Sequence, residues 1–304
     1  MSDQKVPVYF LAGFYGRKDA LGILAYPRML PSNSEFCRFF THINEQWGKT
    51  DLDFQCKSLT YLNEPSRNYR GWWILGRNGE VQEISTAGTH KEQIEGAGLN
   101  YSEPYGYLEA IKNIDGSLHA CGYGRQVYRR VGDSWVSLSD SILTRDTARG
   151  FFDIDGLSEK NLYAVGWQGD IYFYDGRGWY RDESPTNAHL AGVKCLPDGQ
   201  VWVCGNRGVV LCGAFGNWHL VDSNSFENNW YSIELFEGTP YLAGNNFLAK
   251  VEHNRIVPVD TGLKYQITTH KLHAREGILW SIGEEDILAF DGKIWTPLAH
   301  PDNS

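Results

Sequence analysis

The chain has 304 residues, of which 14% are aromatic and only 21% are charged, and it contains 33 glycines. This composition favours strands and turns over helices. The formal net charge of −9 argues against nucleic-acid binding, which relies on basic patches, whereas an acidic surface suits solubility or attraction to a basic partner.

The start of the chain, MSDQKVPVYFLAGFYGRKD, has no basic segment followed by a long apolar run. We therefore expect neither a signal peptide nor a membrane span. The six cysteines form no Cys-x-x-Cys pair and lie in strand-like segments. They are expected to be reduced core residues of a cytoplasmic protein, and we predict no metal site and no cofactor.

A repeat runs along the whole chain. Residues 6–51 fit a first copy with the strands VYFLAG, LGILAY, FCRFFTHI and WGKTD. From GWWILGRNGEVQEI onward the copies share an apolar strand, a glycine, two or three polar residues and a second apolar strand, usually followed by a turn and a tryptophan. Further copies are SLHACGYGRQVYRRVGDSWV, NLYAVGWQGDIYFYDGRGWY, QVWVCGNRGVVLCGAFGNWH, TPYLAGNNFLAKVEHNRIVP and GILWSIGEEDILAFDGKIWT.

The glycine that ends the first strand of this template sets the period. Its positions are separated by 46, 44, 39, 39 and 39 residues, at Gly76, Gly122, Gly166, Gly205, Gly244 and Gly283. These glycines lie between strands and no Gly-Lys-Ser/Thr follows, so a phosphate-binding loop is not predicted.

A further strand precedes each template and ends in Asp-Gly or Glu-Gly, as in AIKNIDG, FFDIDG, VKCLPDG, IELFEG and HKLHAREG. Such a pair between apolar runs is a hairpin signal, so each repeat has four antiparallel strands, A to D. Four strands in about 40 to 45 residues are typical of a β-propeller. We predict one all-β propeller of seven blades, with six or eight as alternatives, and with blades at 6–53, 54–95, 106–139, 150–182, 189–222, 230–260 and 269–299.

The turns after the second strand carry a family resemblance. YDGRGW, FDGKIW, VGDSW and FGNW resemble the Asp-x-Gly-x-x-Trp corner of bacterial-neuraminidase-type repeats. Through them nearly the whole chain resembles WD/YVTN-like propellers, including photosystem-assembly-factor-like ones. The resemblance implies a fold and not a function, because propellers host many activities.

The loops on one face are the candidates for function, because B–C hairpins and D–A crossovers of a propeller share a face, here called the top face. The B–C tips carry side chains that a turn does not require, and arginine and aromatic residues commonly anchor interfaces. We predict partner contacts from Arg77, Tyr123, Arg125, Trp167, Gln168, Arg207, Asn245, Asn246, Glu284 and Glu285.

Blades five and six are expected to form an acidic sector. No lysine or arginine occurs from Gly208 to Ala249, whereas four acids occur, at Asp222, Glu227, Glu234 and Glu237. Such a sector would suit a basic protein partner. Asp222, Glu227 and Trp230 are therefore added to the predicted partner contacts.

The leading hypothesis is a non-catalytic propeller that binds another protein, and its most specific form is a bacterial immunity-type protein that neutralises a cognate toxin. An alternative is a glycosidase or lyase in the central top pocket. A sialidase-like site would need converging arginines, for which Arg77, Arg125, Arg145, Arg149 and Arg207 are candidates. However, the Arg-Ile-Pro motif of sialidases is absent, as are Gly-x-Ser-x-Gly and His-Glu-x-x-His.

A third hypothesis is an assembly factor for a larger complex, as the resemblance to photosystem-assembly propellers implies. The chain ends bear on the closure of the ring. Residues 1–5 and 299–304 are short and polar, so we expect no additional closing strand and closure by packing alone.

Overall fold

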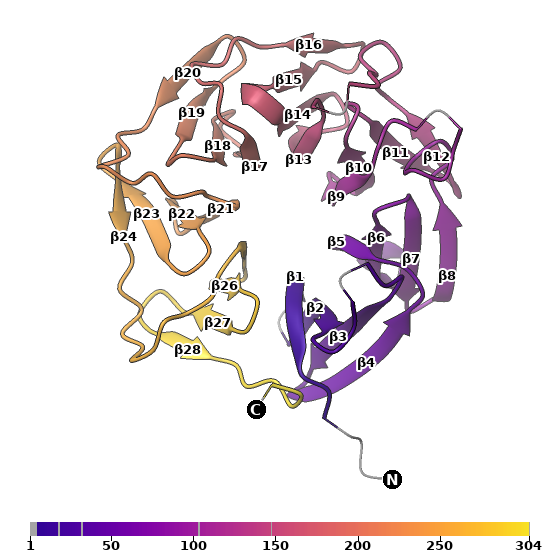
Figure 1. Cartoon of the computed structure of the whole chain (residues 1–304), viewed down its shortest axis with the longest axis vertical. Coiled ribbons are helices and arrows are strands. Elements are labelled where there is room, and N and C mark those ends of the chain that lie inside the picture. The colour runs from indigo at the N-terminus through magenta and orange to yellow at the C-terminus, as the bar shows by residue number, and fades with distance from the viewer. Residues whose placement is uncertain (1–4, 18, 32, 103, 147, 304) are drawn as a thin grey trace.

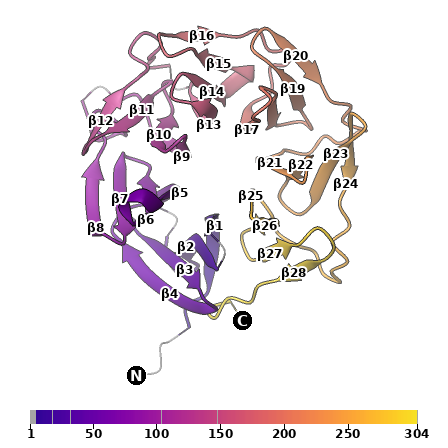
Figure 2. The same ribbon diagram turned by 180° about the vertical axis from the view of Figure 1, so that it is seen from behind.

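A computed structural model describes residues 5–17, 19–31, 33–102, 104–146 and 148–303. Seven four-stranded sheets stand around a central axis as the blades of a propeller, seen from its two faces in Figures 1 and 2. Within each blade the strands are antiparallel and follow one another in chain order from the axis outward. The seven-bladed all-β fold predicted from the repeat is confirmed.

The strands of blades 1 to 3 are β1 (Val8–Arg17), β2 (Ala20–Pro27), β3 (Cys37–Ile43), β4 (Gln46–Leu52), β5 (Cys56–Glu64), β6 (Tyr69–Gly76), β7 (Glu80–Ser85), β8 (Gly88–Gln93), β9 (Leu108–Ile114), β10 (Ser117–Gly122), β11 (Val127–Val131) and β12 (Ser134–Ser137). Blades 4 and 5 comprise β13 (Phe151–Ser158), β14 (Asn161–Gly166), β15 (Ile171–Tyr174), β16 (Trp179–Arg181), β17 (Leu190–Cys195), β18 (Val201–Gly205), β19 (Val210–Ala214) and β20 (Asn217–Leu220). Blades 6 and 7 comprise β21 (Ser232–Phe236), β22 (Thr239–Ala243), β23 (Leu248–Glu252), β24 (Arg255–Pro258), β25 (Lys271–Arg275), β26 (Ile278–Ile282), β27 (Ile287–Phe290) and β28 (Trp295–Pro297).

Helix is confined, within the described residues, to the single turns η1 (Pro65–Arg67) and η2 (Trp167–Gly169). No described helix is long and apolar enough to cross a membrane.

Most of the Asp-Gly and Glu-Gly pairs turn the chain as predicted. At Asp115–Gly116 both residues have positive φ, 50° and 82°, as a two-residue hairpin of type I′ requires. The Glu-Gly pairs at 237–238 and 276–277 have the same signs.

The turn predicted at Asp155–Gly156 is wrong. Strand β13 continues to Ser158, and Asp155 lies opposite Tyr163 within the sheet. The carboxylate of Asp155 instead accepts a hydrogen bond from the backbone N–H of Cys195 in the next blade, at 2.8 Å. A turn at Asp155 would remove this link between blades.

Hydrophobic side chains fill the spaces between neighbouring blades. Between blades 2 and 3, Trp73 and Leu75 of β6 pack with Ile111 of β9 and Leu118 of β10. Blade-to-blade packing explains why central strands such as β18 are apolar on both faces, since each face meets a neighbour. All six cysteines are free, and only Cys212 is not fully buried, which agrees with their expected role as core residues.

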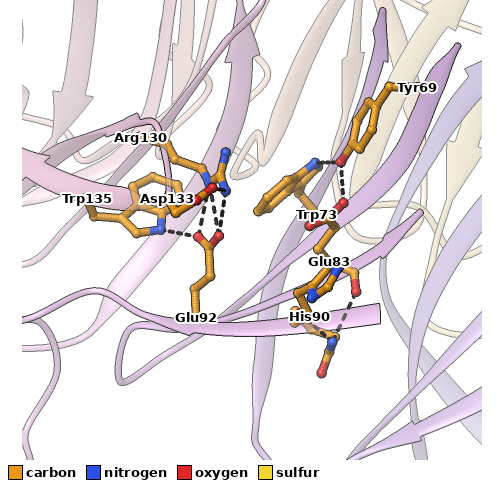
Figure 3. A network of polar contacts seen from close by, with 9 residues as sticks. Tyr69, Trp73, Glu83, His90, Glu92, Arg130, Asp133 and Trp135 are labelled. Atoms are coloured by element: carbon orange, nitrogen blue, oxygen red, sulfur yellow. Dashed lines mark hydrogen bonds and ion pairs between the residues drawn. The ribbon is translucent and has the colours of Figure 1, made fainter. Parts of the chain in front are cut away.

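A partly buried polar network joins blades 2 and 3 near their outer edges (Figure 3). The carboxylate of Glu92 accepts hydrogen bonds from Arg130 at 2.7 Å and from the indole of Trp135 at 2.8 Å. The Arg130 guanidinium lies 4.6 Å from the ring centre of Trp73. On the same side Tyr69 donates to Glu83 and accepts from Trp73, and burial raises the pKa of Tyr69 well above its usual value. The polar groups of this network satisfy one another's hydrogen bonds within the scaffold. The network therefore supports the fold, and the loops form the top face.

Within the part of the chain that the structure describes, the ring closes without a shared strand, because blades 1 and 7 are each built from consecutive strands. The expectation of closure by packing alone is nevertheless incomplete. The side-chain amide of Asn303 accepts from the backbone N–H of Val8 at 2.9 Å and donates to its carbonyl at 3.0 Å. The N–H of Phe10 also donates to the carbonyl of Glu284. Hydrogen bonds with Asn303 of the C-terminal segment and with Glu284 of the β26–β27 hairpin therefore supplement the packing.

Candidate partner-binding face

A cavity of about 870 Å³ opens on the top face at the axis of the ring. Its walls are formed by the first residues of the inner strands and by the B–C hairpins, which approach the axis from several blades. The lining is mostly aromatic and amide-bearing, with Tyr9, Tyr26, Phe36, Phe152 and Tyr231 together with Gln55, Asn206, Asn245 and Asn246. Its charged members are Lys57, Glu109, Lys271 and Glu284.

An aromatic cluster stands at the rim beside blade 4. The ring of Trp167 lies 5.4 Å from Phe152, 5.9 Å from Tyr123 and 4.5 Å from the imidazole of His189. Phe152 and His189 also line the cavity, so the cluster continues its wall. The indole N–H of Trp167 has no hydrogen-bond partner among the described residues. That N–H is buried, so the half-buried ring offers a partner its aromatic surface, which is typical of an interface anchor.

The backbone of η2 places Trp167 at this rim. Gln168 and Gly169 have positive φ, 50° and 77°, which tightens the hairpin between β14 and β15. The N–H of Gln168 donates to Nδ1 of His189 at 3.0 Å, so the tip is tied to the crossover that enters blade 5.

A buried ion cluster supports the same hairpin from behind. Asp170 is fully buried and its carboxylate meets three arginines: Arg125 at 2.9 Å, Arg181 at 3.2 Å and Arg149 at 3.6 Å. The guanidinium of Arg125 also lies over the ring of Tyr172. A buried carboxylate surrounded in this way is expensive to leave unpaired, so the cluster fixes the tip that carries Trp167.

The structure brings part of the predicted set together. Asn245, Asn246 and Glu284 line the cavity, and Tyr123 and Trp167 form the adjoining aromatic cluster. Gln168 is exposed beside them. Arg125 lies behind the cluster and is held by Asp170, so its role is to support the rim.

The remaining tip residues have partners of their own. Arg77 donates to Glu35 at 3.1 Å and lies over Tyr107. Arg207 is exposed and donates to the amide of Asn187 at 2.6 Å. Glu285 forms an ion pair with Arg28 at 2.9 Å across the closure of the ring.

Blades 5 and 6 do not carry their acids on one surface. Glu234 is buried against the channel and pairs with Lys194 at 2.6 Å. Asp222 pairs with Arg255 at 3.0 Å, and Glu227 is exposed. The predicted acidic sector is therefore reduced, because cations from flanking segments neutralise two of its four members.

Trp230 needs a correction, since it is fully buried and cannot contact a partner directly. Its ring packs against Phe226 and Phe247 in the core between blades, and its backbone N–H donates to the carbonyl of Gly205. The tryptophan ends a crossover that folds inward, which the run of polar residues before it did not indicate.

The enzyme hypothesis gains no arginines that converge on an open site, because Arg125 and Arg149 converge with Arg181 on the buried carboxylate of Asp170. Arg77, Arg125, Arg149 and Arg207 hold the contacts given above, and Arg145 lies over Tyr105. No arginine lines the central cavity within the described residues. The described part of the chain also holds no group of three or more His, Cys, Asp or Glu side chains placed to bind a metal ion.

Sequence reasoning missed Phe152, His189, Asp170 and Lys271. Phe152 and Lys271 are at the starts of inner strands, and Asp170 follows a hairpin glycine, so each looked like part of the repeating scaffold. One signal in the sequence could have identified Lys271. Successive side chains of a strand point to opposite faces, and a lysine on an inner strand is expected on the face toward the axis because the other face packs in the core.

Comparisons with known proteins found similarities both in sequence and in fold. The immune protein Tsi7 of Pseudomonas aeruginosa is 32% identical over 249 residues, which are 81% of this chain and 80% of that protein. No family model matches the chain. Among solved structures, the WD40 propeller domain of Doa1 superposes with a TM-score of 0.68 at 13% identity, covering 96% of this chain and 94% of that domain. YCF48 bound to D1 peptide superposes with a TM-score of 0.66 at 14% identity, covering 93% and 91%. The two structural likenesses support the fold alone.

Proposed function

The chain belongs to the family of the immune protein Tsi7, and we propose that it is a non-catalytic immunity protein that neutralises a cognate toxin by binding it with the top face. The family relationship confirms the immunity-type hypothesis drawn from the sequence. The proposal adds the mode of action, and the observation that carries it is the central cavity with its aromatic rim.

The rim is suited to protein binding for a physical reason. Large aromatic side chains gain much of their free energy of binding by burial, and anchors of this kind lie near the centre of an interface. Trp167 and Tyr123 stand beside the axis, where a partner segment entering the cavity would cover them. The proposal includes action in the cytoplasm and a partner of positive net charge, which the net charge of −9 would attract.

Co-expression with the product of the neighbouring gene tests the proposal. We expect the wild-type protein to protect cells from that product and to form a complex with it on purification. If neither a complex nor protection is observed, the proposed toxin-neutralising function is wrong.

The place of binding is tested by Trp167→Ala. Because an anchoring tryptophan commonly contributes at least about 2 kcal/mol to binding, we expect an affinity at least about 30-fold weaker and a matching loss of protection. Tyr180→Ala is the control, since Tyr180 is an exposed aromatic residue on the outer strand β16. Equal effects of both variants, or none from Trp167→Ala, would move the interface away from the rim.

One observation favours a second candidate function, the assembly factor. The structurally similar YCF48 was solved with D1 peptide bound, so a propeller of this shape accepts a peptide. An assembly role would predict stable association with a subunit of a larger complex in place of a toxin. Fractionation of native lysate distinguishes the two by the size and identity of the co-purifying protein.

A further inference from the structure

Charged side chains of the inner strands pair with one another in the cavity and along the axis below it. They come from the inner strands β5, β9, β13, β17 and β21 and form ion pairs between neighbouring blades: Lys57 with Glu109 at 2.9 Å, Lys112 with Asp153 at 3.3 Å, and Lys194 with Glu234 at 2.6 Å. These three ion pairs neutralise most of the charge that the inner strands would otherwise present toward the axis.

Lys271 is the exception at the cavity. It is the first residue of β25 and lines the cavity, and within the described residues no carboxylate forms an ion pair with it. Asp153 attracts it from across the channel, but that carboxylate already binds Lys112 and the backbone N–H of Val193. Burial lowers the pKa of Lys271 below its usual value, and Lys112 lowers it further. Glu284 is the other charged residue of the lining that forms no ion pair with a described residue, but it is exposed at the rim, where water solvates it.

Lys271 and Asp155 lie at different depths along the axis. Asp155, the other acid of β13, lies further from the top face and accepts a hydrogen bond from the backbone N–H of Cys195. Lys271 therefore adds to the cavity lining a cation with which no described carboxylate forms an ion pair, in a lining that is mostly aromatic and amide-bearing.

We propose that the cavity receives a projecting segment of the partner protein, and that Lys271 forms an ion pair with an Asp or Glu side chain of that segment. The inference rests on the proposed function and adds the chemistry of its central contact. A volume of about 870 Å³ lies within the roughly 300–1,000 Å³ typical of ligand sites, and the amides supply donors and acceptors for a peptide backbone. Charge complementarity selects the carboxylate, and the net charge of −9 disfavours a nucleic acid.

The first experiment compares Lys271→Met with Lys160→Met. Methionine keeps the length of the lysine side chain and removes the charge, and Lys160 is an exposed lysine at the β13–β14 hairpin on the opposite face. Calorimetric titration with the product of the neighbouring gene is expected to give an affinity about 30-fold weaker for Lys271→Met, as for loss of one partner of a recessed charge pair. Lys160→Met should stay within about threefold of wild type, and melting temperatures confirm that both variants fold.

The second experiment identifies the acid by charge reversal. Lys271→Glu is titrated against a set of partner variants in which each Asp or Glu is changed in turn to Lys. One of these should bind Lys271→Glu at least about tenfold more tightly than the wild-type partner does. If Lys271→Met binds weakly and no reversal restores binding, Lys271 supports the wall of the cavity and the proposed ion pair is wrong.

Other outcomes separate this inference from the proposed function. If wild-type protein does not bind the partner, the proposed function falls and this inference falls with it. If wild-type protein binds and Lys271→Met binds equally well, only this inference is overturned. Titration with free glutarate tests whether the carboxylate comes from a small molecule. If glutarate binds at millimolar concentration in a manner that depends on Lys271, and Lys271→Met leaves partner binding unaffected, the cavity is a metabolite site.

Discussion

His300 occupies an aromatic cage at the junction of the first and last blades. Its imidazole lies 4.3 Å from the ring of Phe40, 4.5 Å from Trp47 and 5.1 Å from Phe10, and only 4% of the residue is exposed. Burial lowers the pKa of His300 to about 4, while an unfolded histidine has a pKa of about 6.5. The folded protein therefore holds this histidine neutral under conditions in which the unfolded chain takes up a proton.

Between about pH 6.5 and pH 4 the unfolded state binds more protons than the folded state, so the free energy of unfolding should fall as the pH is lowered through this window. The contribution of His300 is at most about 3 kcal/mol. His300→Asn keeps an acceptor for the N–H of Asp302, so it should flatten the pH dependence measured by urea denaturation. His253→Asn, at an exposed turn residue with φ of 50°, should leave the slope unchanged. Equal slopes in wild type and His300→Asn would contradict this assignment.

At the scale of the element, the hairpin between β14 and β15 depends on Asp170. Its carboxylate compensates arginines from three segments, so Asp170→Asn should leave them without a buried counter-charge and lower the free energy of unfolding by about 3 kcal/mol. The same variant should weaken partner binding, because the tip that holds Trp167 loses its support. Asp198→Asn provides the matched control at an exposed turn. Chemical denaturation and calorimetric titration measure the two effects, and a stable Asp170→Asn with unchanged affinity would refute the supporting role.

The strands of each blade could be predicted from the sequence because their signals are local. Alternating apolar runs and hairpin glycines fix most elements without knowledge of the neighbouring blade. The error at Asp155 shows the limit, since the residue continues a strand to reach Cys195, which is 40 positions away. The lining of the central pocket was predicted only in part for the same reason. Phe152, His189 and Lys271 gain their role from meeting at the axis, and this depends on the arrangement of all seven blades.

At the scale of the whole molecule, ring closure holds the cavity in shape. The walls of the cavity include Phe10 of blade 1 and Thr268 and Lys271 at the start of blade 7, which meet across the junction. The hydrogen bond from Phe10 to Glu284 and the pair between Val8 and Asn303 span this junction. A loosened junction should therefore widen the site as well as destabilise the fold.

Asn303→Ala tests this coupling between closure and binding. The variant leaves the backbone N–H of Val8 without its side-chain partner and removes one donor to the carbonyl of Val8, which keeps the Nε–H of Arg28 at 3.3 Å, so we expect a loss of about 1–3 kcal/mol in the free energy of unfolding. Asn303→Asp keeps the acceptor for the Val8 N–H but loses the donor, and it should fall between wild type and Asn303→Ala. Amide hydrogen exchange should quicken in β1 and β26, on the two sides of the junction, and stay unchanged in β14 on the far side of the ring. Because Lys271 and Phe10 lie on opposite sides of the junction, partner affinity should fall in the same order as stability. Uniform exchange across all blades would instead mean that the ring opens as one cooperative unit, with no weak point at its closure.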